Sequence, residues 1–244
     1  MGKPVSTTDK ARAEKKALTR AENKVFAPLT PIIQRHQQTF EKLGLPIDLS
    51  QPVFPEKKPL DAEVLAIAGN KSGKWIGIAP FAQHEGKVYP EDLMQQVIDG
   101  LAEQAEYTLF LFGGGAAETE KLQQFAKGRT NIIVTAGRLK LKQELNLISH
   151  LDLMLSMDSG NAHMAAMLGV KVVTLWGATH PYAGFAPFCQ PEDFAITADR
   201  QQYPLLPTSI YGNKVVDGYQ DAMKTIQPSA VINKISAILK QKTL

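Results

Sequence analysis

A short polar stretch between two apolar runs holds the residues with the greatest capacity for chemistry. The runs are residues 151–157 and 171–177, and residues 158–163 between them read Asp-Ser-Gly-Asn-Ala-His. If the first run is a strand, Ser159 and Gly160 lie where it turns into a helix, and the backbone N–H groups of that turn face outward at the positive end of the helix dipole. Such a turn can bind a phosphate, although Ser-Gly can equally serve only as a helix start.

Asp158 and His163 in the same stretch also have two readings each. A phosphate repels a neighbouring carboxylate, so Asp158 beside a phosphate turn would face another group, for instance sugar hydroxyls. His163 lies one helical turn further on and could support the turn, but a single histidine in such a position is more commonly a hydrogen-bonded core residue. The combination of these residues favours a binding turn.

Two other segments could complete a nucleotide site. Lys87 follows Gly86 in a loop and is either a solvated surface lysine or a point charge that neutralises a diphosphate. Gly114, Gly115 and Glu118 could bind a ribose, because glycines let a nucleoside lie against the chain and a carboxylate accepts from two vicinal hydroxyls. Many strand-to-helix turns share this pattern. It differs from the G-x-G-x-x-G motif of dinucleotide-binding folds, which argues against a nicotinamide enzyme.

The elements that must position these residues alternate along the chain from residue 75. Apolar runs predict strands at 75–80, 107–113, 131–136, 151–157, 171–177 and, more weakly, 193–198, and amphipathic patterns predict helices at 90–104, 118–127, 140–149 and 160–168. Near-continuous apolar strands alternating with helices predict a doubly wound, Rossmann-like α/β domain with a parallel sheet. Ligands of such sheets bind at the carboxyl ends of the strands, where all the candidate residues lie.

Residues 1–74 differ in character from the rest. Residues 1–50 form a basic helical segment, of which residues 1–24 read as a solvated helix or a disordered arm and the remainder predicts a helix that stops at Gly44 and Pro46. Residues 51–74 hold three prolines and no periodicity, and we expect a linker. The third unit, residues 75–244, is closed by a helix predicted from Pro228.

Composition argues against several classes of protein. The net charge is +3, and residues 1–24 hold seven basic against three acidic residues, so the rest of the chain is not a nucleic-acid surface. The single Cys189 cannot form an internal disulfide and suits a reducing compartment. No apolar run is long enough to span a bilayer, and no His/Cys cluster suggests a bound metal. We expect a cytoplasmic protein without a metal or other cofactor.

The stretch SMDSGNAHMAAMLGVKVVTLWGATHP resembles the D-[ST]-G-x-x-H-x-A-A-x-x-G…P-x-x-x-L-[FYW]-G-x-T-x-P signature of the family-nine glycosyltransferases. This family contains the ADP-heptose:lipopolysaccharide heptosyltransferases and their relatives. Shorter pieces follow the family's order: IAPFAQHEGKVYP resembles its strand and Lys-x-[WY]-P loop, LFGGGAAETEKL its G-G-x-x-E turn, and MKTIQPSAVINKI its closing helix. The resemblance covers roughly residues 30–244.

The resemblance implies the C-terminal domain of a glycosyltransferase B fold, which holds a nucleotide-sugar donor. Transferred to this sequence, the family's pattern makes Lys87 the ligand of the diphosphate. Glu118, in the turn with Gly114, would bind the ribose hydroxyls, and the backbone near Leu139 would bind the adenine edge. The donor would be an ADP-sugar, bound without a metal.

The same pattern assigns the residues of the polar stretch. Asp158 would bind sugar hydroxyls, the amides of Ser159 and Gly160 would bind a phosphate, and His163 would support that turn. This sequence departs from the family's pattern at several positions, which bear on the identity of the sugar more than on the nucleotide site: Ala82, Gln83, Lys171 and His180.

Family members begin with an acceptor-binding domain that supplies an aspartate as general base. Nothing before residue 75 reads as a set of parallel strands, so residues 1–50 are expected to be a remnant of that domain. No residue of this chain is therefore expected to be catalytic. The exposed surface toward the missing half is expected to promote self-association or to bind that half.

The resemblance thus implies the donor half of an inverting glycosyltransferase. It would transfer a heptose or similar sugar from an ADP-sugar to a lipopolysaccharide-type acceptor, in the cytoplasm or at the inner face of the inner membrane. Because the acceptor domain is expected to be absent from this chain, the chain alone is expected to be inactive. Two alternatives remain open, a non-catalytic nucleotide-binding module and a sugar-nucleotide epimerase of the same architecture.

Overall fold

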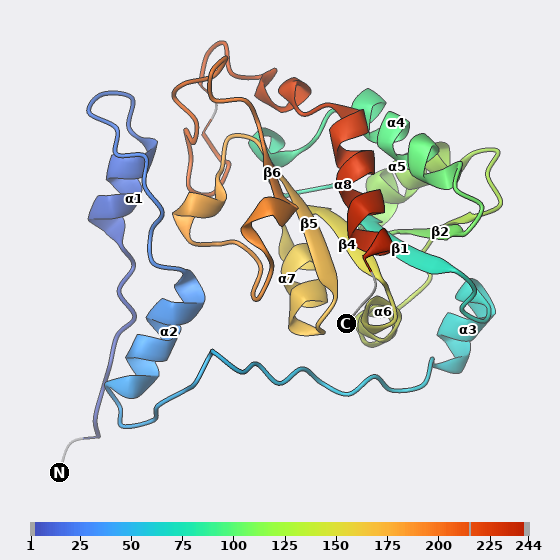
Figure 1. The fold of residues 1–244 in the computed structure, drawn as a ribbon, viewed down its shortest axis with the longest axis horizontal. Coiled ribbons are helices and arrows are strands. Elements are labelled where there is room, and N and C mark those ends of the chain that lie inside the picture. Colours follow the sequence, from blue (N-terminus) through green and yellow to red (C-terminus); the bar gives the residue numbers. More distant parts are fainter. Residues whose placement is uncertain (1–2, 215, 242–244) are drawn as a thin grey trace.

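The computed structural model describes residues 3–214 and 216–241 and contains a six-stranded parallel sheet (Figure 1). The strands are β1 (Lys74–Ala79), β2 (Tyr107–Leu111), β3 (Ile132–Val134), β4 (Leu153–Met157), β5 (Lys171–Trp176) and β6 (Ala195–Thr197). They lie in the order β3-β2-β1-β4-β5-β6, the Rossmann order, whose switch point falls between β1 and β4. Each strand matches a predicted apolar run, so the predicted doubly wound α/β fold is confirmed.

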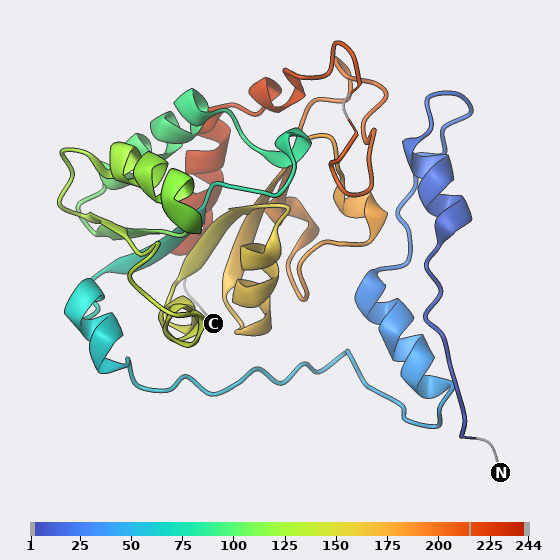
Figure 2. The same cartoon turned by 180° about the vertical axis from the view of Figure 1, so that it is seen from behind.

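Helices cover both faces of the sheet (Figures 1 and 2). One face carries α4 (Glu91–Ala102), α5 (Gly115–Ala126) and α8 (Pro228–Lys240), and the other carries α3 (Ala62–Ala68), α6 (Leu141–Ser149) and α7 (Gly160–Met167). Short 3-10 helices lie in the loops: η1 (Glu85–Lys87), η2 (Pro181–Ala183), η3 (Glu192–Phe194) and η4 (Ala222–Thr225). The four helices predicted between strands and the closing helix are all present.

Strands β1, β2, β4 and β5 bury side chains on both faces, which explains why their sequences are apolar without alternation. On β1, Ile76 and Ile78 belong to the core under α4, α5 and α8, whereas Trp75 and Ala79 belong to the core under α3, α6 and α7. Because the six strands run parallel, the loops that follow β1, β2 and β4 leave the sheet at one edge.

The N-terminal segment lies against loops of the α/β domain rather than against its sheet (Figure 1). It contains α1 (Arg12–Thr19) and α2 (Ile32–Glu41). The Leu29 N–H donates to the Tyr182 carbonyl at 2.9 Å, and the Arg200 guanidinium lies 3.4 Å from the centroid of the Phe26 ring. Leu18 is fully buried, so α1 is a packed helix and neither a disordered nor a purely solvated arm.

The expected linker includes the short helix α3, which was not predicted because three prolines precede it in the segment. Val64 of α3 is fully buried in the core under α6 and α7, and the Asp61 N–H donates to Asn146 Oδ1 at 2.9 Å. The stretch between α2 and α3 is extended and runs along one side of the molecule (Figure 2).

Across residues 3–214 and 216–241, no helix combines the length and the apolar character needed to cross a membrane.

Candidate functional site

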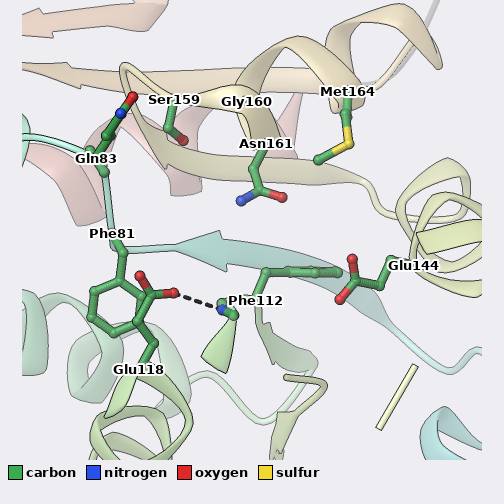
Figure 3. A pocket seen from close by; sticks show the side chains of 12 residues that line it. Phe81, Gln83, Phe112, Glu118, Glu144, Ser159, Gly160, Asn161 and Met164 are labelled. Atoms are coloured by element: carbon green, nitrogen blue, oxygen red, sulfur yellow. Dashed lines mark hydrogen bonds between the residues drawn. The ribbon is translucent and has the colours of Figure 1, made fainter. Parts of the chain in front are cut away.

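A cavity of about 310 Å³ opens at the carboxyl edge of the sheet (Figure 3). Its wall combines the loops that follow β1 and β2 with the first turn of α7 and one residue of α6. The lining residues are Phe81, Ala82, Gln83, Phe112, Gly113, Gly114, Glu118, Glu144, Ser159, Gly160, Asn161 and Met164. The cavity lies next to the switch point between β1 and β4, where open α/β sheets bind their ligands.

The first turn of α7 presents backbone amides to this cavity. Ser159 is the N-cap residue of α7 with an extended backbone (φ −148°, ψ 174°), and its side chain makes no capping hydrogen bond. Its hydroxyl instead lies 3.1 Å from the Ser156 hydroxyl. A Cβ atom added to Gly160 would meet nothing within 4 Å, so a ligand can approach the backbone closely. The turn can therefore bind an anion at the positive end of the helix dipole.

The turn between β2 and α5 is capped by its own helix. Glu118 Oε2 accepts a hydrogen bond from the Gly114 N–H at 2.7 Å, as the dashed line in Figure 3 shows. Gly115 has a φ of +73°, in the left-handed region that favours glycine. A carboxylate can accept further hydrogen bonds on its second oxygen, so capping by Glu118 and binding of a ribose hydroxyl are compatible.

A nearly buried ion pair adjoins the α7 turn. Lys87 Nζ lies 3.2 Å from Asp158 Oδ2, and the two side chains are only 15% and 10% exposed. The residues meet because Lys87 ends η1 after β1, Asp158 follows β4, and these strands are neighbours in the sheet. Lys87 is therefore not a solvated surface lysine. The lysine also compensates the carboxylate, which would otherwise repel a phosphate at the turn.

His163 lies in α7, one turn after this ion pair, and is partly buried. Burial lowers the pKa of His163, the Asp158 carboxylate opposes that shift, and the Lys87 ammonium adds to it. His163 is therefore neutral at neutral pH. A proton on His163 would attract the Asp158 carboxylate and repel the Lys87 ammonium.

The structure brings most of the predicted site residues together. Four of them line the cavity: Gly114, Glu118, Ser159 and Gly160. Three more adjoin it: Lys87, Asp158 and His163. Leu139 is the exception, because its side chain packs against the core under α6 and α7 and does not line the cavity. The assignment of its backbone to an adenine ring stays a prediction.

Sequence reasoning missed Glu144 of α6, whose carboxylate is drawn near the Phe112 ring in the cavity wall (Figure 3). Glu144 is partly buried, and burial raises its pKa. Its sequence signal was its spacing: it stands three and four residues before the buried Leu147 and Ile148, on the apolar face of the helix. Phe81 and Phe112 gave no comparable signal, since Phe81 directly follows the predicted strand 75–80 and Phe112 lies within the predicted strand 107–113, both as ordinary apolar residues.

The acidic residues near the cavity do not converge on one point. Glu118 caps α5, Asp158 pairs with Lys87, and Glu144 projects from α6. In the described part of the chain, no three His, Cys, Asp or Glu side chains are grouped so that they could hold a metal ion.

Comparison with known proteins identifies the family. The sequence matches the model of the family described as glycosyltransferase family 9 (heptosyltransferase) over residues 2–208. It is 24% identical to lipopolysaccharide heptosyltransferase 3 of Escherichia coli (strain K12) over 164 residues, which are 63% of this chain and 46% of that protein. The match therefore spans about half the length of this curated relative.

Solved structures share the fold. Superposition on E. coli heptosyltransferase WaaC with ADP gives a TM-score of 0.61 at 16% identity and covers 89% of this chain and 60% of that one. A family 9 glycosyltransferase from Veillonella parvula DSM 2008 gives 0.65 at 19% identity, over 86% and 60% of the two chains. The E. coli ADP-heptose lps heptosyltransferase II gives 0.56 at 22%, over 81% and 60%. The match of the family model to most of the sequence shows that this chain belongs to glycosyltransferase family 9, the heptosyltransferase family.

Proposed function

We propose that the cavity binds an ADP-sugar and that the chain is the donor-binding part of an inverting glycosyltransferase. The transferred sugar would be a heptose or a similar sugar, and the acceptor a lipopolysaccharide-type glycan. The observation that carries this proposal is the uncapped first turn of α7, which faces the cavity beside the nearly buried Lys87. The family supports it, and a heptosyltransferase that shares the fold was solved with ADP.

The parts of the cavity suit the parts of the donor. The diphosphate would lie at the α7 turn, where the amides of Ser159 and Gly160 donate hydrogen bonds and Lys87 supplies a full positive charge. Asp158 would keep Lys87 in place and bind sugar hydroxyls, while His163 supports the turn. Glu118 would bind the ribose, and the adenine edge would meet the backbone near residue 139.

The same groups would favour the chemical step. When the bond between the sugar and the diphosphate breaks, negative charge accumulates on the departing ADP. Donors that are already oriented toward that charge stabilise the transition state more than the ground state. Lys87 and the dipole of α7 supply this positive charge, so the reaction that we propose uses no metal ion.

The general base is not assigned to this chain. Asp158 is engaged by Lys87 and adjoins the donor site, so it is poorly placed to deprotonate an acceptor hydroxyl. Alignment of an acceptor with its base can lower a barrier by about 7–11 kcal/mol, a contribution that a donor site alone lacks.

The chain alone is therefore expected to bind ADP-heptose but to transfer heptose negligibly. The measurement is release of ADP from ADP-heptose with and without a lipid acceptor, beside a full-length relative. Turnover at a rate comparable to that of the relative would mean that this chain contains an acceptor site.

Calorimetric titration with ADP tests the donor site directly. Lys87→Ala should weaken binding by at least about 1.5–3 kcal/mol, the value of one charge-assisted hydrogen bond, because the variant also leaves the Asp158 carboxylate uncompensated beside the phosphate. Lys127→Ala is the matched control, because Lys127 is exposed and follows the far end of α5. Chelation of metals with EDTA should leave the affinity unchanged. Loss of binding in EDTA, or equal binding by wild type and Lys87→Ala, would overturn the assignment.

A further inference from the structure

The loop Ser209–Asn213 lies against the side chain of Lys87, although it is distant from it in the sequence. Gly212 is buried and has a φ of +80°. A Cβ atom added to Gly212 would overlap Lys87 Cγ and lie 2.8 Å from Lys87 Cδ. The stem of Lys87 thus occupies the space that any other residue at position 212 would need.

Hydrogen bonds anchor this loop to Ala178, which follows β5. The N–H groups of Thr208 and Ser209 both donate to the Ala178 carbonyl, at 3.0 and 3.1 Å. The Ala178 N–H in turn donates to the Gly86 carbonyl at 2.8 Å, one residue before Lys87. The loop and the segment that carries Lys87 are therefore fastened to the same residue after β5.

The Ser209 side chain also holds the loop in its own conformation. Its hydroxyl oxygen accepts from the Gly212 N–H at 2.9 Å and from the Tyr211 N–H at 3.3 Å, and the hydroxyl donates to Asn213 Oδ1 at 3.1 Å. On the outer side, the ammonium of Lys15 in α1 lies 4.6 Å from the centroid of the Phe185 ring and 5.9 Å from that of Tyr211.

We infer that the loop Ser209–Asn213 is a positioning element for Lys87. A lysine stem has several rotatable bonds and loses considerable rotamer freedom when it is fixed. Gly212 packs on the middle of this stem and Asp158 binds its end, so the ammonium is held in place before a donor arrives. Gly212 and Ser209 would therefore affect diphosphate binding without touching the ligand. The inference rests on the proposed role of Lys87 as the ligand of the diphosphate.

A pair of glycines provides the test. Gly212→Ala is compared with Gly218→Ala, because Gly218 has nearly the same φ, +79°, and a Cβ atom there would meet nothing within 4 Å. Both variants carry the same backbone strain, and only the first collides with Lys87. Titration with ADP should show an affinity at least about tenfold lower for Gly212→Ala than for Gly218→Ala, as expected when a charge-assisted contact is lost.

Two further readouts separate positioning from a general structural effect. Adenosine lacks the diphosphate, so its affinity, measured by NMR titration, should be the same in both glycine variants. In a Lys87→Ala background the two glycine substitutions should affect ADP binding equally, because the collision is then absent. Ser209→Ala adds no atom and serves if Gly212→Ala does not fold; it should lower ADP affinity about two- to tenfold, the effect of a neutral hydrogen bond.

The outcomes distinguish the inference from the proposed function. If the wild type does not bind ADP, or binds it equally well as Lys87→Ala, the proposed function fails and the inference fails with it. If Lys87→Ala weakens binding as expected but Gly212→Ala behaves like Gly218→Ala, the positioning role alone is overturned.

Discussion

Two strand-to-helix turns face the same cavity, yet they are built with opposite electrostatics. The turn after β2 places the Glu118 carboxylate on its own N-cap amide, so its helix dipole is already compensated. The turn after β4 has an N-cap serine that makes no capping bond, with a nearly buried lysine beside it. Similar glycine-containing turns can thus present an acceptor of hydrogen bonds in one case and donors in the other. This difference matches the hydroxyls and the phosphates of the proposed donor.

The largest expected effect comes from breaking the ion pair of the α7 turn. Asp158→Asn leaves the Lys87 ammonium nearly buried without a compensating charge, and the loss of one partner of such a pair costs about 3–5 kcal/mol. Urea unfolding followed by circular dichroism should show a free energy of unfolding that is lower by this amount. The double variant Lys87→Met with Asp158→Asn removes both charges and should recover much of the stability. A single variant as stable as the wild type would show that the pair is not buried in solution.

The next effect concerns the α5 turn. Glu118→Gln keeps an oxygen that can accept from the Gly114 N–H, so the melting temperature should change little. The loss of a charged acceptor should weaken the binding of ADP by about 1.5–3 kcal/mol if Glu118 binds the ribose. Glu120→Gln, on an exposed position of the same helix, is the control. A large loss of melting temperature with unchanged ADP affinity would mean that Glu118 only caps the helix.

The α7 turn should also respond to pH through His163, whereas the α5 turn has no histidine. Burial lowers the pKa of His163 in the folded protein, so the unfolded chain binds a proton at a higher pH than the folded chain does. The contribution of neutral His163 to the free energy of unfolding is therefore complete above the unfolded pKa of 6.5. It decreases as the pH falls below that value. Thermal unfolding between pH 7 and pH 5 should show a smaller decrease for His163→Gln than for the wild type. Parallel curves would indicate that His163 is exposed.

The smallest effect is expected at Ser159. Substitution of an N-cap serine that caps its helix costs about 1 kcal/mol, but the Ser159 hydroxyl bonds Ser156 instead. Ser159→Ala should therefore lower the free energy of unfolding by less than about 0.5 kcal/mol. ADP affinity should persist, because the backbone amides bind the phosphate. A loss of 1 kcal/mol or more would show that the serine caps α7 in solution.

The sheet and the first turns of its helices could be predicted because they depend on local patterns. Strands covered on both faces need uninterrupted apolar residues, and that need is visible in the runs of β1, β2, β4 and β5, whereas the edge strands β3 and β6 are less buried. Polar residues at the end of a parallel strand must face the carboxyl edge, so the convergence of Glu118 and Ser159 followed from topology alone.

Contacts between segments that are distant in the sequence could not be predicted from local patterns. The pairing of Lys87 with Asp158 depends on the adjacency of β1 and β4, and either residue alone is compatible with a solvated position. The packing of Phe26 beneath Arg200 likewise joins residues of two irregular segments, for which hydrophobic periodicity gives no signal. Charge and polarity in the sequence therefore pointed to residues that line or adjoin the cavity, but not to the partners of those residues.

The ion pair between Lys87 and Asp158 also determines how the site would respond to dissolved salt. A lone lysine in the cavity would gather a counter-ion, and a ligand would have to displace it, so affinity would fall as salt is added. Asp158 already occupies that place at 3.2 Å from the ammonium. The α7 amides that face the cavity carry partial charges rather than full ones. The affinity of this site for ADP is therefore expected to fall less steeply with ionic strength than the affinity of a site with an unpaired lysine.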